Sequence, residues 1–206
     1  MIGIVDYGMG NLRSVQKGLE KVGAVCEIVD TAESIRSADK LVLPGVGGFG
    51  EATDHLRTAG LVEPIRRFIE TGRPFLGICL GYQLLFDRSS EEGEHTGLGV
   101  FAGDIVRFDF SGLPEAADLK VPHMGWNQLW WDRACPLLKG LDSGTYFYFV
   151  HSYYARPTDP HVNRALCEYG IRFAAMAWRD QVFATQFHPE KSQRDGLHLL
   201  ANFAAL

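Results

Sequence analysis

The stretch Phe75-Leu76-Gly77-Ile78-Cys79-Leu80-Gly81 decides the fold class of this chain. Its first four residues form a short apolar run, and a helical pattern that carries Leu80, Leu84 and Leu85 follows the glycine-flanked turn. A buried strand that passes directly into a helix is typical of parallel sheets covered by helices on both faces. The stretch therefore predicts an α/β fold.

The residues before this stretch repeat the alternation of short apolar runs and helical spacing. Apolar residues recur every three or four positions between Leu12 and Val22, which predicts a helix that Asn11 caps. Strands are predicted at 2–5, 25–29 and 40–43, and a second helix over 61–69. This alternation indicates a mostly parallel central sheet.

The second half of the chain has a different pattern. Between residues 100 and 187, short aromatic and β-branched runs are separated by turn residues, which favours antiparallel or mixed strands that extend the sheet. The segment from Ser192 to Asp195 is close to a capping box, so we expect a final helix there. The combined prediction is a three-layer α/β sandwich, with a mostly parallel central sheet and antiparallel strands in the second half. No linker or repeat interrupts residues 1–206, so we expect a single domain.

The composition excludes several classes of protein. Apolar residues make up 46% of the 206 residues and charged residues 22%, which is typical of a globular protein and not of a disordered one. With a formal net charge of −5, the chain lacks the basic surface of a general nucleic-acid binder. No charge-free stretch reaches the roughly 18 residues of a membrane span, and no basic leader precedes the first apolar run. We therefore expect a soluble, cytoplasmic protein that contacts neither membrane nor nucleic acid.

The four cysteines, at positions 26, 79, 135 and 167, indicate neither a metal site nor a disulfide framework. No two of them form a Cys-x-x-Cys pair, and a reducing compartment is the expectation for a chain without a leader. We expect no metal and no cofactor. A cysteine of this kind is by default a small buried hydrophobic residue, and Cys79 is the exception.

Cys79 has glycines two positions to either side, at a strand-to-helix junction. This is the nucleophile-elbow pattern with cysteine in the place of serine, because glycines leave room for so tight a turn. The start of the helix should favour a thiolate, and the backbone N–H of Leu80 is where an oxyanion donor belongs. Cys79 is therefore a candidate nucleophile, although a core cysteine in a tight turn would show the same local pattern.

The motif His188-Pro189-Glu190 follows a predicted strand at 182–187. Residues two apart in an extended segment face the same way, so Glu190 can orient the imidazole of His188 and leave its other nitrogen for Cys79. A surface turn with a partly exposed His–Glu pair is the alternative for this motif alone. Together with the cysteine elbow, the motif indicates a Cys–His–Glu triad for nucleophilic catalysis.

A glycine-rich loop, PGVGGFG, occupies residues 44–50. Its spacing matches the dinucleotide-binding fingerprint in form, but that fingerprint belongs in the first strand–helix turn and this loop follows the third strand. A glycine loop at the carboxyl end of a strand can instead direct backbone N–H groups toward an oxyanion. A tight turn that merely requires glycines is the alternative.

These motifs resemble those of the class I, or triad-type, glutamine amidotransferases. FLGICLGYQ at 75–83 is similar to the nucleophile motif of that family, and TQFHPE at 185–190 is similar to its His–Glu motif. The resemblance implies hydrolysis of glutamine to glutamate and ammonia, with Cys79, His188 and Glu190 as the catalytic triad. It also implies an oxyanion hole and a glutamine site, made by Val46, Gly47 and Leu80 and by Gln83, His151, Ser152 and Tyr153, respectively.

Four segments narrow the resemblance to a branch of the family in histidine biosynthesis: DYGMGNL (6–12), PGVGGFG (44–50), PHMGWN (122–127) and YFVHSY (148–153). In that branch, the glutaminase subunit passes ammonia to a (β/α)8-barrel cyclase, which makes imidazole glycerol phosphate and aminoimidazole-carboxamide ribotide. The resemblance therefore implies a heterodimer with such a cyclase. The residues it implies at the interface are Asn11, Met124, Trp126, Tyr148 and Lys191.

The composition of the segment 122–126 also favours a docking surface. Met124 and Trp126 are of the residue types enriched at interface cores. Burial in the core of this chain is the alternative for the tryptophans, and it is the state we expect for Trp130 and Trp131.

Two other functions are compatible with these motifs. The first is the glutaminase of a different triad amidotransferase, such as the vitamin B6 or anthranilate branch, which would share Cys79, His188 and Glu190. The second is an inactive, amidotransferase-like regulator. An intact triad argues against the regulator, because such a protein does not need those three residues together.

Overall fold

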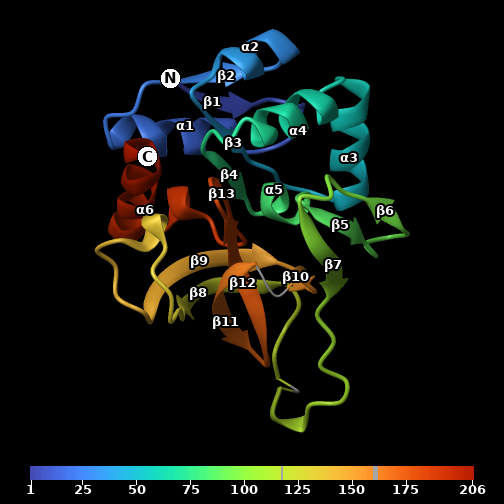
Figure 1. Cartoon of the computed structure of the whole chain (residues 1–206). Coiled ribbons are helices and arrows are strands. Elements are labelled where there is room, and N and C mark those ends of the chain that lie inside the picture. Colours follow the sequence, from blue (N-terminus) through green and yellow to red (C-terminus); the bar gives the residue numbers. More distant parts are fainter. Residues whose placement is uncertain (117, 160–161) are drawn as a thin grey trace.

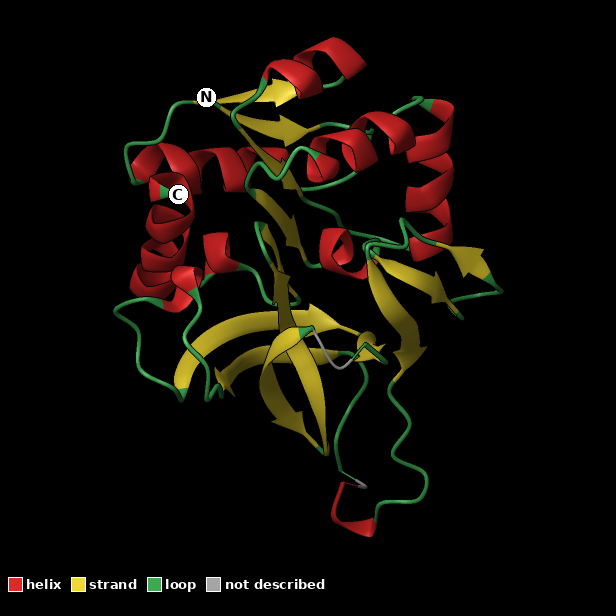
Figure 2. Cartoon of the chain, viewed as in Figure 1, coloured by secondary structure: helices red, strands yellow, loops and turns green. Residues whose placement is uncertain are grey.

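Strands and helices alternate along the first half of the chain, and strands predominate in the second half (Figure 2). The computed structural model describes residues 1–116, 118–159 and 162–206, so positions 117, 160 and 161 of the predicted strand region lie outside the described residues. In chain order, the elements are β1 (Ile2–Val5), α1 (Leu12–Lys21), β2 (Cys26–Val29), α2 (Ala32–Ser37), β3 (Lys40–Leu43), α3 (Phe49–Thr58), α4 (Val62–Glu70), β4 (Phe75–Ile78), α5 (Leu80–Gln83), β5 (Phe86–Ser89), β6 (His95–Thr96), β7 (Phe101–Arg107), η1 (Pro114–Ala116), β8 (His123–Leu129), η2 (Pro136–Leu138), β9 (Thr145–His151), β10 (Tyr153–Pro157), β11 (Asn163–Tyr169), β12 (Ile171–Arg179), β13 (Val182–Thr185), η3 (Pro189–Lys191) and α6 (Gln193–Ala205).

A mixed sheet of eleven strands forms the centre of the described structure (Figure 1). Its order is β2-β1-β3-β4-β13-β12-β10-β7-β5-β6, and β11 pairs with β12. The strands from β2 to β13 in this order are parallel, whereas β12, β11 and β10 run antiparallel to the strands that they pair with. The predicted α/β fold, with a mostly parallel sheet followed by antiparallel strands, is confirmed.

Two apolar cores lie on opposite faces of the parallel strands, because successive strand residues point to opposite faces. On one face, Leu41 and Phe75 pack in a core that includes residues of α2, α3 and α4. On the other face, Val42 and Leu76 pack in a core with residues of α1 and α6. Helices therefore cover both faces of the sheet, which gives the three layers.

Two helices go beyond the sequence prediction. Helix α2 begins with a capping box between Thr31 and Ser34. Helix α3 begins at Phe49, inside the glycine-rich segment that we expected to be loop as far as residue 50. Gly48 is the N-cap of this helix, a position where glycine is tolerated. The carboxylate of Glu91 accepts the N–H of Phe49, the first residue of the helix, at 2.7 Å.

The helix that follows Cys79 is shorter than its leucine pattern predicts. Helix α5 has four residues, and Leu84 is its C-cap. The carbonyls of Leu84 and Leu85 accept hydrogen bonds from the N–H groups of Leu98 (2.7 Å) and Val100 (2.8 Å), so a distant segment takes the acceptors that a longer helix would use. The dipole of a single turn is correspondingly small, and any effect on Cys79 comes from its individual N–H groups.

Two expectations for the second half of the chain were wrong. Strands β8 and β9 form a two-stranded sheet of their own and do not extend the main sheet. The capping box expected at Ser192 is not made, because the hydroxyl of Ser192 donates to the carbonyl of His188 at 2.6 Å and accepts the N–H of Tyr148 at 3.0 Å. Ser192 is the N-cap residue of α6, but its side chain links β9 to the histidine and makes no capping hydrogen bond.

Strands β4 and β13 are parallel neighbours in the middle of the sheet, and Ile78 lies opposite Thr185. The N–H of Cys79 donates to the carbonyl of Thr185 at 2.7 Å. Because the two strands end together, the segments that follow them begin side by side. This pairing brings Cys79 close to His188.

Candidate active site

Cys79 occupies a backbone conformation that is rare for a residue with a side chain, with φ 55° and ψ −108°. The two flanking glycines make this turn possible. A Cβ atom at Gly81 would lie 1.8 Å from the carbonyl oxygen of Leu43, and one at Gly77 would lie 2.7 Å from that of Gly81. The turn places Cys79 at the carboxyl end of β4, where the residue is buried with 8% of its surface accessible.

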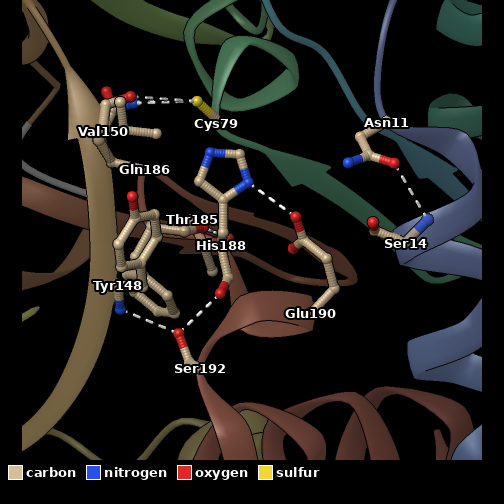
Figure 3. A network of polar contacts seen from close by, with 11 residues as sticks. Asn11, Ser14, Cys79, Tyr148, Val150, Thr185, Gln186, His188, Glu190 and Ser192 are labelled. Carbon is tan, nitrogen blue, oxygen red and sulfur yellow. Dashed lines mark hydrogen bonds and ion pairs between the residues drawn. The ribbon is translucent and has the colours of Figure 1, made fainter. Parts of the chain in front are cut away.

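His188 lies between Cys79 and Glu190 (Figure 3). Its Nδ1 is 2.7 Å from Oε1 of Glu190, and both side chains are almost completely buried. The other ring nitrogen, Nε2, is buried and has no hydrogen-bond partner among the described residues. The imidazole thus has one nitrogen held by a carboxylate and the other free to exchange a proton beside the sulfur.

The surroundings of His188 favour its charged form. Burial acts to lower the pKa of the imidazole, but the nearby sulfur of Cys79 and the hydrogen bond to Glu190 outweigh burial and raise that pKa to about 10. The protonated imidazole is therefore the state that these contacts stabilise, and it places a proton donor next to the sulfur at neutral pH.

A cavity of about 310 Å³ opens next to the sulfur. Its size falls at the lower end of the range for small-molecule sites. Most of the residues predicted for catalysis, oxyanion binding and substrate contact line it, together with one predicted interface residue: Val46, Gly47, Cys79, Leu80, Gln83, His151, Ser152, Tyr153, His188 and Lys191. The remaining triad member, Glu190, lies behind His188, away from the cavity (Figure 3).

The loop between β3 and α3 is packed against the turn at Cys79. The hydroxyl of Tyr7 donates to the carbonyl of Pro44 at 3.0 Å, and a Cβ atom at Gly45 would lie 2.5 Å from that hydroxyl and 2.9 Å from the Cβ of Leu80. Gly47 has φ 96°, a conformation that favours glycine. Glycine at 45 and 47 therefore lets the loop approach the residue that follows the sulfur.

The other predicted interface residues lie outside the cavity. On the two-stranded sheet, Met124 and Trp126 of β8 are 63% and 45% exposed, and Tyr148 of β9 faces Trp126 edge to face. Asn11 caps α1 by accepting the N–H of Ser14. The N–H of His188 donates to the carbonyl of Tyr148 at 2.9 Å, so this sheet contacts the triad directly.

The expected burial of the next two tryptophans is wrong for Trp130, which is 44% exposed, while Trp131 is half-buried. Trp130 follows the end of β8 and makes an isolated bridge to Leu166. It continues the alternation that exposes Met124 and Trp126, and this places its ring on the same outer face.

Sequence reasoning missed four residues of the site: Glu91, Pro122, Val150 and Gln186. Glu91 lies in an acidic loop without a motif, and only the tertiary fold brings it to the cavity. Gln186 is part of the motif that ends in His188, but a strand pattern gives no sign that its side chain reaches Cys79. Proximity to His188 in the sequence was the one usable signal.

None of the helices in the described part of the chain combines the length and the apolarity needed to cross a lipid bilayer.

A model of the glutamine amidotransferase class-I family matches residues 3–205 of the chain. The imidazole glycerol phosphate synthase subunit HisH of Syntrophotalea carbinolica is 57% identical over 203 residues, which cover 98% of this chain and 98% of that protein. The subunit HisH of Geobacter sulfurreducens is 51% identical over 205 residues, covering 100% and 98%. That of Aquifex aeolicus is 50% identical over 201 residues, covering 97% and 94%.

Solved structures share the fold. A crystal structure of a glutamine amidotransferase superposes with a TM-score of 0.75 at 21% identity, over 100% of this chain and 99% of that one. The structure of PurLQS from Thermotoga maritima gives a TM-score of 0.71 at 18% identity, over 98% and 96%. At these identities, the likeness concerns the fold alone.

Proposed function

Since the chain belongs to the class I glutamine amidotransferase family, we propose that it is the glutaminase subunit of an imidazole glycerol phosphate synthase. It hydrolyses glutamine to glutamate and ammonia, and it passes the ammonia to a cyclase subunit. The names of relatives that match almost the whole chain support the assignment. We further propose that residues 1–206 act as one domain and that the cyclase is a (β/α)8 barrel bound as a heterodimer.

The arrangement of Cys79, His188 and Glu190 carries this proposal. The sulfur attacks the carboxamide carbon of glutamine after its proton passes to Nε2 of His188. His188 then gives that proton to the leaving nitrogen, and ammonia departs from a γ-glutamyl thioester. Water attacks the thioester, its proton returns through His188 to the sulfur, and glutamate is released. Glu190 holds the tautomer of His188 and stabilises its charged form throughout.

Backbone N–H groups from two segments that line the cavity suit the oxyanion of the tetrahedral intermediate. The N–H of Leu80 follows the nucleophile directly, and the loop at Val46 and Gly47 lines the same cavity. We propose the N–H of Val46 as the second donor, reached by rotation of a glycine-flanked peptide. The cavity also holds Gln83 and the carboxylate of Glu91, whose charge complements the α-amino group of glutamine.

Docking of the cyclase is expected to activate the triad, because ammonia released into bulk water would be protonated and lost. Glutamate release should be very slow for the isolated subunit, faster for the complex, and fastest for the complex with the nucleotide ligand of the cyclase. Steady-state glutamate release under these three conditions measures the effect. Equal rates under all three conditions would contradict activation by the cyclase but would not affect the assignment of the triad. Absence of glutamate under every condition would contradict the proposed function.

The exposed residues of β8 are the docking surface we propose for the cyclase. Replacing Trp126 by alanine should weaken cyclase binding by about 30-fold or more, because a large exposed aromatic residue is a typical binding hot spot. The control variant is Val25→Ala, directly before the edge strand β2, where the side chain is 72% exposed. Calorimetric titration measures both, and equal affinities for the two variants would place the cyclase elsewhere.

A further inference from the structure

Gln186 is a fully buried amide that has no part in the mechanism above. It directly follows β13, and its N–H donates to the carbonyl of Ala175 at 2.8 Å. Its side chain extends toward Cys79 (Figure 3). The carboxamide nitrogen lies 3.9 Å from the sulfur, within the range of a hydrogen bond to sulfur.

The backbone carbonyl of Tyr153, acting through Gln83, determines which end of the Gln186 carboxamide faces Cys79. The carbonyl of Tyr153 can only accept, so the group of Gln83 that lies 3.1 Å from it must be the nitrogen. The same nitrogen of Gln83 lies 3.0 Å from the carboxamide of Gln186, which must therefore present its oxygen there. The nitrogen of Gln186 is left to face Cys79.

A second chain of contacts holds the Tyr153 carbonyl in place. Asn127 donates from its amide nitrogen to the carbonyl of Glu168 (2.8 Å) and to Nε2 of His123 (3.2 Å). The proton of His123 is therefore on Nδ1, which donates to Nε2 of His151 at 3.0 Å. His151 in turn donates from Nδ1 to the carbonyl of Tyr153 at 2.8 Å.

Both histidines of this chain are neutral, as the tautomers require. Burial lowers the pKa of His123 to about 4 and is the main cause that lowers the pKa of His151 to about 3. The Tyr153 carbonyl thus accepts two hydrogen bonds from groups that are themselves held by further partners. Reversing the amide of Gln186 would require Gln83 to lose both of its acceptors, which is costly in a buried site.

We propose that Gln186 is a further catalytic residue, whose carboxamide N–H donates to the thiolate of Cys79. An N–H donor stabilises the thiolate more than the thiol, because the charged sulfur is the better acceptor. The thiol has a different partner available, since the sulfur lies 4.0 Å from the carbonyl of Val150 and can donate to it. The two protonation states therefore use different partners of the sulfur.

The same amide couples the nucleophile to the substrate side of the cavity. Gln83 lines the cavity, and its nitrogen is occupied by Tyr153 and Gln186, so its carboxamide oxygen is the polar atom available to glutamine. This inference rests on the proposed glutaminase function, because it requires Cys79 to react as a thiolate.

The test compares the full-length variants Gln186→Met and Gln186→Glu with the unmodified chain. Methionine removes the donor at similar volume, and glutamate replaces it with an acceptor. The rate at which iodoacetamide alkylates Cys79, followed by peptide mass spectrometry across pH, reports the thiolate. The other titratable groups near the sulfur and around its cavity are shared by the variants: Tyr7, Glu91, His151, Tyr153, His188, Glu190 and Lys191.

We expect the midpoint of alkylation to rise by about one pH unit or more in both variants, which is the scale of a hydrogen bond to a charged group. In complex with the cyclase, kcat for glutamine should fall by about 10- to 100-fold, more than KM changes. The matched control is Asn202→Leu, which removes a half-buried amide of α6 that donates to the carbonyls of Leu137 and Lys139, and it should leave both measurements unchanged.

Glutamate has nearly the same shape as glutamine. If the midpoint of Cys79 alkylation were unchanged in the folded Gln186→Glu variant, the proposal would be overturned even if kcat fell, because Gln186 would then act only through packing. Circular dichroism of each variant and calorimetric binding to the cyclase check that the variant is folded. If Cys79 of the unmodified chain reacted no faster than the half-buried Cys26, the proposed function would fail along with this inference.

Discussion

Replacement of Cys79 by alanine should abolish glutamine hydrolysis and leave ammonia-dependent synthesis by the complex intact. The variant lacks the sulfur that forms the thioester, and loss of a triad nucleophile reduces the rate by at least about 10⁴-fold. Ammonia added to the solution bypasses the missing step, because the cyclase subunit uses ammonia and not glutamine. The measurement is the rate of product formation by the complex with glutamine and, separately, with an ammonium salt.

The control for this experiment is Cys26→Ala. Cys26 is a free, half-buried thiol at the start of the edge strand β2 and does not line the cavity, so the variant should keep both activities. Glutamine-dependent activity within tenfold of the unmodified complex in Cys79→Ala would show that another residue is the nucleophile.

Replacement of Glu190 by glutamine should lower kcat by about 10⁴-fold, the scale seen when the acid of a catalytic triad becomes an amide. The carboxylate accepts from Nδ1 of His188 at 2.7 Å, and a carboxamide can instead donate to that nitrogen and select the wrong tautomer. Glu70→Gln is the matched control, because Glu70 is exposed at the end of α4. Steady-state kinetics of the complex measure both, and a decrease below tenfold for Glu190→Gln would remove Glu190 from the triad.

The same variant should change the pH dependence of stability. The pKa of His188 is raised from 6.5 to about 10 in the folded chain, so its protonated form contributes stability that is fully present below about pH 6.5 and is lost as the pH rises toward 10. Without the carboxylate, the folded pKa falls, and less stability is lost over that window. Denaturant unfolding between pH 6 and pH 10 measures the slope, and identical slopes for the two proteins would contradict this account of the His188 pKa.

The features that the sequence predicted are those that depend on neighbours in the chain. The parallel strands follow from short apolar runs, and the turn at Cys79 follows from its two glycines. The juxtaposition of His188 with Glu190 requires only a spacing of two. Each of these features can be predicted without knowing any contact between distant residues. The family resemblance rests on the same local motifs.

The features that could not be predicted depend on partners far away in the sequence. Helix α5 ends after one turn because Leu98 and Val100 take the carbonyls of Leu84 and Leu85. Trp130 is a large apolar residue of the kind usually buried in a core. It is exposed because it follows β8, which pairs with β9 in a separate sheet and not with the main sheet. Gln186 and Glu91 reach the site through tertiary contacts that leave no periodic pattern.

The position of β13 in the sheet also governs when the enzyme becomes active during its synthesis. β13 is the last strand of the chain, yet it inserts between β4 and β12. As translation proceeds, β1 to β4 emerge first and can pair, but the β4 edge remains open until residues 182–185 have left the ribosome. Closing a pair so distant in sequence is slow compared with forming local structure. His188 arrives with that closure, so an unfinished chain holds a cysteine without its base and releases no ammonia.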